Sequence, residues 1–215
     1  MQIGNISRFL ILPQEHLCLL HQKAAQTTKF TLQLLTQTVY FLRAERQPVQ
    51  MRSACRTAFA PSLPALTNGL RALSAPMGVY AALGNHDNGF GTAAIRHALE
   101  AAGITVLDDQ STIVMHNGVP IHLIGFKDAY WSQPDVAAAL SAVPLEAQAL
   151  CFTHSPDLFP RLPKTCAFTL AGHTHGGQVW LPIVGRMIVP SAFGQRYAAG
   201  EVHEDGKTLF VATGI

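Results

Sequence analysis

Short apolar runs alternate with polar loops from about residue 61 onward. Residues 77–83 (MGVYAAL) and 147–153 (AQALCFT) are almost continuously apolar, which is typical of strands buried on both faces of a sheet. Residues 92–102 instead place their apolar side chains at helical spacing, between Thr92 and Gly103 at the two ends. Asn117-Gly118 joins two further segments and predicts a hairpin. This alternation favours an α/β protein with mixed sheets.

The same pattern gives the remaining elements. Strands are predicted at residues 77–83, 104–107, 111–116, 119–125, 147–153, 166–171, 178–181, 186–189 and 207–213. Helices are predicted at residues 17–42, 64–74, 92–102, 134–140 and 157–162. The first 60 residues are rich in Gln, Thr and Leu and lack the later alternation of strand, loop and helix. We therefore divide the chain into an atypical segment, residues 1–60, and a domain, residues 61–215.

Three of the apolar strands end in polar clusters of similar form. These clusters are Gly84-Asn85-His86-Asp87, His154-Ser155-Pro156-Asp157 and Gly172-His173-Thr174-His175. In open α/β sheets, functional groups gather at the carboxyl ends of the strands, so the clusters predict one shared site. Imidazole and oxygen donors without a thiolate suit Mn, Fe, Zn or Co. Each cluster has a plainer alternative, in which its histidines only cap or line a turn.

Composition and charge narrow the functional classes. Charged residues make up 13% of the chain, against about 25% in typical soluble domains, so we expect extensive burial or a lipid-facing surface. The net charge of +2 is too small to favour nucleic acid. Residues 1–86 carry eight Lys or Arg and two Glu, and the first aspartate is Asp87. This basic segment suits an anionic membrane or a phosphate-rich partner, unless it merely reflects a different sequence origin.

The cysteines and the apolar segments point to an internal compartment. The four cysteines form no C-x-x-C pair, which fits buried thiols in a reducing environment. No segment has the form of a signal peptide or the length of a membrane span. We therefore expect a cytoplasmic protein, with peripheral contact to a membrane as a further expectation.

The ordered set of strand-end motifs resembles a known family. Residues 84–87, the lone His154 after an apolar strand and residues 172–175 resemble the last three motifs of the calcineurin-like metallophosphoesterases. Residues 176–199 resemble the bacterial branch of membrane-associated phosphodiesterases and UDP-2,3-diacylglucosamine hydrolases. The resemblance implies two mixed β-sheets packed as a sandwich and flanked by helices. It also implies hydrolysis of a phosphodiester or pyrophosphate bond, on a substrate that could be lipid-linked, by a metal-activated hydroxide.

The resemblance assigns a role to each motif residue. One divalent metal would bind Asn85, His154 and His173, and a second would bind His175. His86 would be the general acid or transition-state donor beside the phosphate, and Asp87 would orient it. Four other histidines lack a strand-end context and are predicted to lie on the surface or in the sheets: His97, His116, His122 and His203.

The chain departs from the family pattern at its N-terminal end. The family begins with Asp-x-His and Gly-Asp-x-x-Asp motifs, and neither exists here because no aspartate precedes Asp87. We therefore expect an incomplete N-terminal part of the fold and one metal or none, and we interpret residues 1–60 as a frame-shifted or foreign segment. Two alternatives to an active enzyme stay open. One is an inactive, degenerate fragment that binds at most one metal, and the other is a non-catalytic binding protein on the same fold.

Overall fold

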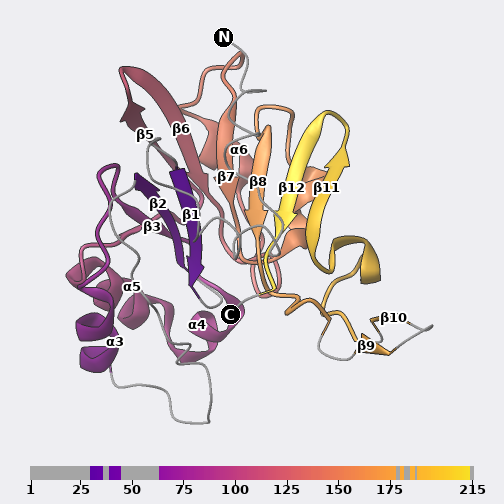
Figure 1. Cartoon of the computed structure of the whole chain (residues 1–215), viewed down its shortest axis with the longest axis horizontal. Helices are drawn as coiled ribbons and strands as arrows, with labels where there is room; N and C mark the ends of the chain where they lie inside the picture. Colours follow the sequence, from indigo (N-terminus) through magenta and orange to yellow (C-terminus); the bar gives the residue numbers. More distant parts are fainter. Residues whose placement is uncertain are drawn as a thin grey trace, which may run out of the picture.

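The fold is built on two mixed β-sheets (Figure 1). The computed structural model describes residues 30–35, 39–44, 63–177, 180–181, 185–186 and 188–213. The smaller sheet has the order β1-β2-β3-β4, with β1 Phe30–Leu35, β2 Val39–Ala44, β3 Val79–Ala81 and β4 Thr105–Val106. Its first two pairings are antiparallel, and β3 is parallel to β4.

The larger sheet has the order β11-β12-β8-β7-β6-β5, and Figure 1 shows these strands side by side. Its strands are β5 Gln110–His116, β6 Val119–Gly125, β7 Ala149–Phe152, β8 Phe168–Ala171, β11 Gly200–Glu204 and β12 Lys207–Val211. The central strands β6, β7, β8 and β12 are mutually parallel, and antiparallel strands close both edges. The carboxyl ends of the four central strands therefore meet at one edge of the sheet.

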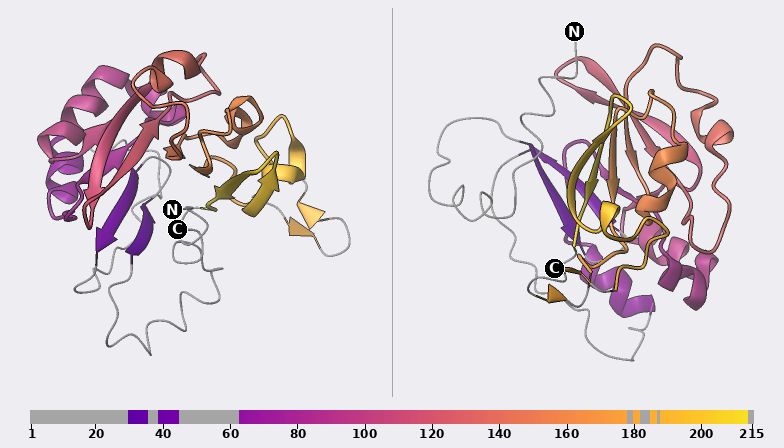
Figure 2. Two further views of the ribbon diagram at one scale, coloured as in Figure 1. Left: turned by 90° about the horizontal axis from the view of Figure 1, so that it is seen from above. Right: turned by 90° about the vertical axis from the view of Figure 1, so that its right-hand side faces the viewer.

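Helices cover the outer faces of both sheets. On the smaller sheet, α3 Leu63–Leu70 and α5 Thr92–Ala101 cover a buried cluster that includes Val79 of β3 and Leu99 of α5. On the larger sheet, α6 Val136–Leu140 and the 3-10 helix η1 Pro156–Arg161 cover a cluster that includes Ile124 and Cys151. Figure 2 shows α3 and α5 on the opposite side of the molecule from β11 and β12.

A separate cluster joins the inner faces of the two sheets. It combines Ala82 and Leu107, from the ends of β3 and β4, with Leu123, Phe152 and Leu170 of the larger sheet. The order of layers is therefore helix, sheet, sheet, helix, and the prediction of a two-sheet sandwich flanked by helices is confirmed. None of the helices within the described ranges has the length and apolar content needed to cross a membrane.

Local chemistry explains several elements. Asn117 and Gly118 both have positive φ (49° and 77°), as a two-residue turn between right-twisted strands requires, and the predicted β5–β6 hairpin is confirmed. Ala102 ends α5, and Gly103 follows it with φ 86°. The remaining short elements are α4 Asn85–Phe90, β9 Trp180–Leu181, β10 Gly185–Arg186 and the 3-10 helix η2 Gly194–Tyr197.

Three predictions about individual elements are wrong, and one strand was missed. The helix expected at 17–42 is replaced, where the structure describes it, by the antiparallel strands β1 and β2. Their sequences, FTLQLL and VYFLRA, contain β-branched and aromatic residues, and β2 is paired on both sides, with β1 and with β3. The polar loop expected at 84–87 is the start of α4, and Gly91 rather than Thr92 precedes α5. Strand β11 was not predicted, because its sequence GEVHE is polar.

Candidate metal centre

Three donor atoms from distant parts of the chain converge at the carboxyl edge of the sheets. His154 Nε2 lies 2.7 Å from Asn85 Oδ1 and 2.9 Å from His173 Nδ1. Asn85 opens α4 after β3, whereas His154 and His173 follow β7 and β8. The structure therefore brings together three of the four residues predicted to bind metal, one from each strand-end cluster.

The spacing of these atoms suits a metal ion better than hydrogen bonds alone. Asn85 Oδ1 is only an acceptor, and a single proton on His154 Nε2 cannot serve both Asn85 and His173 fully. Ligand atoms at about 2.1 Å from one metal lie about 3 Å apart at adjacent corners of an octahedron. The donor set fits a divalent ion that accepts nitrogen and oxygen ligands. Among the described residues, no three His, Cys, Asp or Glu form a metal-binding group, so the carboxamide of Asn85 is essential to the set.

The loop after β8 adopts an uncommon backbone to place His173. His173 and His175 have positive φ (71° and 51°), and Gly176 and Gly177 continue the left-handed path. Positive φ is rare for residues with a side chain and is found preferentially at functional sites. Thr174 between the two histidines anchors the turn, because its buried Oγ1 donates to Ala198 O at 2.7 Å. This hydrogen bond thus fixes the turn that carries both histidines.

Electrostatics keep His173 in the neutral form that binds metals. Burial, together with the neighbouring His154 ring, lowers the pKa of His173 to about 4, although the carboxylates of Asp128 and Asp157 act in the opposite direction. Its Nε2 atom is buried and has no hydrogen-bond partner within the described part of the chain. Neutral imidazole is the ligand form. The ring is therefore ready to bind a cation at neutral pH through Nδ1.

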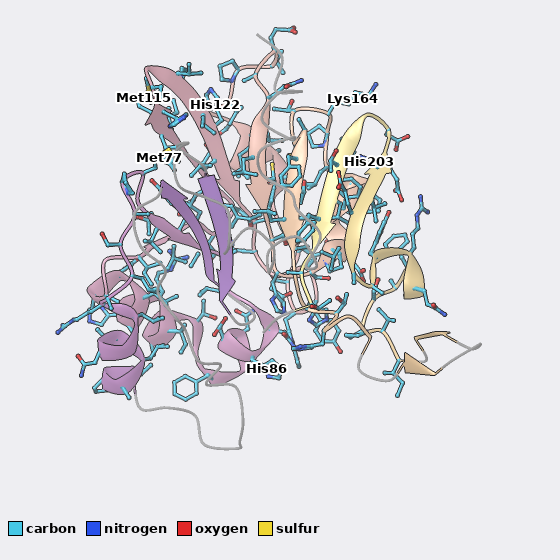
Figure 3. All side chains as sticks on the ribbon, in the orientation of Figure 1. Met77, His86, Met115, His122, Lys164 and His203 are labelled. Carbon is cyan, nitrogen blue, oxygen red and sulfur yellow. The ribbon has the colours of Figure 1, made fainter. Side chains whose placement is uncertain are left out.

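The structure places the other predicted site residues near this cluster. His175 is half-buried and close enough to His173 to lower its pKa further. His86 is exposed on α4, directly after Asn85, and Figure 3 shows it at the opposite end of the molecule from His122. The Oδ2 atom of Asp87 accepts a hydrogen bond from Gly84 N at 2.8 Å. Asp87 therefore secures the start of α4, and its expected role in orienting His86 stays a prediction.

Asp157 has a structural task beside the centre. Its Oδ1 accepts from Ser191 Oγ at 2.5 Å, and its Oδ2 accepts from Ala192 N at 2.7 Å. These bonds tie the loop before η2 to the first turn of η1. Because its charge also raises the pKa of His173, Asp157 is an electrostatic neighbour of the donor set.

Asp128 was not predicted as a site residue. It follows the parallel strand β6, is 1% exposed, and accepts hydrogen bonds from Tyr130 N and Trp131 N at 3.1 and 3.2 Å. Asn88 Nδ2 of α4 lies 3.5 Å from its Oδ2. The sequence offered one signal for Asp128, a polar residue shortly after an apolar strand. The lack of a histidine and the intervening Phe126-Lys127 hid the parallel with the other strand ends.

Comparisons with known proteins agree with this arrangement. The chain is 32% identical over 149 residues to the uncharacterized metallophosphoesterase YkuE of Bacillus subtilis, covering 68% of this chain and 52% of that protein. It is 34% identical over 125 residues to the phosphodiesterase YaeI of Escherichia coli, covering 56% and 45%. YkoQ of Bacillus subtilis, another uncharacterized metallophosphoesterase, is 25% identical over 126 residues, covering 57% and 46%. The chain thus spans about half the length of these relatives. No family model and no solved structure matches it.

Proposed function

Because the chain belongs to the calcineurin-like metallophosphoesterases, we propose that it is a metal-dependent phosphoesterase acting on a phosphodiester or pyrophosphate bond. The observation that carries this proposal is the convergence of three donor atoms: His154 Nε2 lies 2.7 Å from Asn85 Oδ1 and 2.9 Å from His173 Nδ1. These neutral donors would hold one divalent ion, with Mn, Fe, Zn and Co as candidates. His175 would face a second ion, but the aspartates that supply its other ligands in the family pattern are missing here, because none precedes Asp87.

The chain's own residues suggest how such a reaction would be organised. A divalent ion supplies Lewis-acid polarisation of a phosphoryl oxygen and a hydroxide at neutral pH. His86 stands next to Asn85 and is exposed, so it can approach the leaving-group oxygen and donate a proton to it. Asp87 accepts a hydrogen bond from Gly84 N and so fixes the start of α4, which carries both residues. The backbone of α4 would thus couple metal binding at Asn85 to proton transfer at His86.

A second candidate is an inactive fragment that holds at most one metal. It is favoured by the absence of any aspartate before Asp87, since the family motifs that bridge two metals need aspartates there. The third alternative, a non-catalytic binding protein on this fold, predicts a ligand that binds and is not cleaved. Residues 1–29, 36–38 and 45–62 lie outside the described residues, so the interpretation of residues 1–60 as frame-shifted or foreign, and the boundary at residue 60, stay predictions.

Metal content and turnover separate these candidates. The purified chain is loaded with Mn²⁺ or Zn²⁺, and bound metal is measured beside hydrolysis of bis(p-nitrophenyl) phosphate. Hydrolysis that is lost in His86→Ala and His154→Ala, and kept in His122→Ala, supports the enzyme. One bound metal without hydrolysis supports the fragment. A wild-type chain with no bound metal and no hydrolysis also fits the fragment and contradicts the enzyme.

The finer predictions about partners have tests of their own. A lipid-linked substrate, as in the UDP-2,3-diacylglucosamine hydrolase branch, and peripheral membrane contact stay proposals. Sedimentation with vesicles containing anionic lipid tests the contact directly. Cytoplasmic location is equally a proposal, and fractionation of cells expressing the full chain tests it.

A further inference from the structure

A loop beside the candidate metal centre is fixed at both ends by a single buried carboxylate. We call residues 127–135 the aromatic loop. Asp109, which is 8% exposed, accepts from Lys127 N through Oδ1 and from Asp135 N through Oδ2, both at 3.0 Å. Lys127 Nζ adds an ion pair with Oδ2 at 3.3 Å. One side chain thus closes the loop at its first and last residues.

A second buried carboxylate fixes the middle of the aromatic loop. Asp128 accepts from the backbone N–H groups of Tyr130 and Trp131. Ser132 donates to Asp128 O both through its backbone N–H, at 3.2 Å, and through Oγ, at 2.5 Å. Four donors of the aromatic loop therefore converge on one residue, and the backbone that carries the two aromatic side chains is ordered before any ligand binds.

The rings that this ordered backbone presents are exposed. Tyr130 is 59% exposed and Trp131 is 67% exposed. Their centroids are 5.9 Å apart at an interplanar angle of 65°, so the two rings form a corner. The other neighbour of Tyr130 is His173, at 5.0 Å between centroids. The corner therefore adjoins a residue of the donor set.

We propose that Tyr130 and Trp131 bind a planar aromatic ring attached to the phosphate of the substrate, an inference that rests on the proposed phosphoesterase function. A planar ring can stack on one ring of the corner and meet the other edge to face, which are the two favoured aromatic geometries. Tyr and Trp lose little side-chain freedom on binding, and a backbone held by buried carboxylates adds no ordering cost. Contact with His173 places such a ring next to a phosphate held at the centre.

Two phosphodiesters of equal charge test the proposal. Diphenyl phosphate and dicyclohexyl phosphate differ in the aromaticity of their rings, and calorimetry measures the affinity of the metal-loaded chain for each. Diphenyl phosphate is expected to bind about 3- to 10-fold more tightly, the range of one aromatic contact. Tyr130→Leu and Trp131→Leu should abolish this preference. Tyr130→Phe should keep it, as should the control Leu145→Ala, which alters an exposed apolar side chain before the start of β7.

A fluorescence measurement gives a second readout. The chain has two tryptophans, so Trp180→Phe leaves Trp131 as the sole reporter. Diphenyl phosphate should change its emission, and dicyclohexyl phosphate should change it less. Equal affinity for the two esters would overturn the proposal, and binding to phosphatidylcholine vesicles in that case would identify a general apolar surface. No binding of either ester would overturn it as well.

Inorganic phosphate separates this inference from the proposed function. Metal-dependent binding of inorganic phosphate without any ring preference contradicts the aromatic site alone. A ring preference in a chain that binds neither metal nor inorganic phosphate contradicts the metal-dependent function and leaves the aromatic corner as a binding site.

Discussion

Gly84 and His154 are in such close contact that residue 84 has no room for a side chain. A Cβ atom at Gly84 would lie 2.7 Å from His154 Nδ1 and 2.8 Å from its Cε1. The φ of Gly84 is −104°, which any residue adopts, so the reason for glycine is proximity to the imidazole and not backbone conformation. The residue before Asn85 thus shapes the position of a second predicted ligand, 70 positions away in the sequence.

Gly84→Ala should therefore weaken metal binding. The added methyl group must push His154 away from Asn85 and His173, and overpacking of this kind costs about 1–3 kcal/mol of unfolding free energy. We expect at least a tenfold loss of Mn²⁺ or Zn²⁺ affinity by calorimetry. Gly89→Ala is the control, since Gly89 lies in α4, the helix that Gly84 precedes, and nothing lies within 4 Å of its added Cβ. Equal metal affinity in the wild type and Gly84→Ala would argue against His154 as a ligand.

Stability of the metal-free chain should fall as the pH drops from about 6.5 to about 4. The pKa of His173 is lowered to about 4 in the folded protein, against 6.5 in the unfolded chain. The unfolded chain binds the proton more readily in this window, so the stability is present above pH 6.5 and is lost as the pH approaches 4. The expected loss is about 2–3 kcal/mol, from about 1.4 kcal/mol for each pKa unit.

Urea unfolding between pH 4 and pH 7 checks this expectation. His173→Gln should flatten the dependence on pH, because the variant has no titrating group at this position. His97→Gln changes an exposed histidine on α5 and should leave the slope as it is. A slope that is the same in His173→Gln and the wild type would assign the proton uptake to another group.

Most of the elements could be located from the sequence because burial requires a local pattern of apolar residues. Strands β7 and β8 are continuous apolar runs, and Asn117-Gly118 marks a turn that few other residue pairs can form. Pairing between strands that are distant in the sequence produces no such local pattern. Whether residues 30–44 form a helix or two strands depends on the pairing of β2 with β3, and β11 is a strand because it pairs with β12.

The candidate site was predictable in the same way: its strand-end residues could be read from the local sequence, and its long-range contacts could not. Asn85, His154 and His173 could be found because each lies in a polar cluster that ends an apolar run and contains a histidine. Gly84's contact with His154 could not, since it depends on how two sheets approach each other. The role of Asp128 was hidden because its hydrogen bonds go to backbone N–H groups, which every residue except proline offers.

Lys207 should be one of the costliest residues to replace in the larger sheet. It is 4% exposed, and its Nζ donates to Leu162 O at 2.6 Å and Phe159 O at 3.0 Å while lying 4.7 Å from the centroid of the Phe159 ring. Lys207→Met keeps the apolar stem and leaves two carbonyl groups without a charged donor. We expect a loss of about 2–4 kcal/mol in the free energy of unfolding.

Lys164→Met is the control for this prediction, because Lys164 is exposed and labelled at the surface in Figure 3. It should change stability by less than about 0.5 kcal/mol. Because the carbonyl groups bound by Lys207 belong to the segment after His154, metal affinity should also fall in Lys207→Met. Equal stability of the two variants would show that water replaces the lysine without cost.

Asp109→Asn should loosen the aromatic loop without touching the donor set. An amide can accept through only one of its two terminal atoms, so it cannot hold both Lys127 N and Asp135 N as the carboxylate does. In the Trp180→Phe background, acrylamide should quench Trp131 more strongly and the anisotropy of its emission should fall. Metal affinity should stay within about twofold, because no atom of Asp109 is among the three converging donors.

Asp108→Asn provides the neighbouring control for the loop. Asp108 accepts a hydrogen bond from Arg96 Nη2 at 2.8 Å, and among the described residues it forms no hydrogen bond or ion pair with residues 127–135. Asp108→Asn should therefore leave the quenching of Trp131 as it is in the wild type. If Asp109→Asn also leaves quenching and anisotropy unchanged, the bonds to Asp128 alone suffice to order the loop. In that case the ring preference for diphenyl phosphate should survive Asp109→Asn, because the corner formed by Tyr130 and Trp131 would keep its geometry.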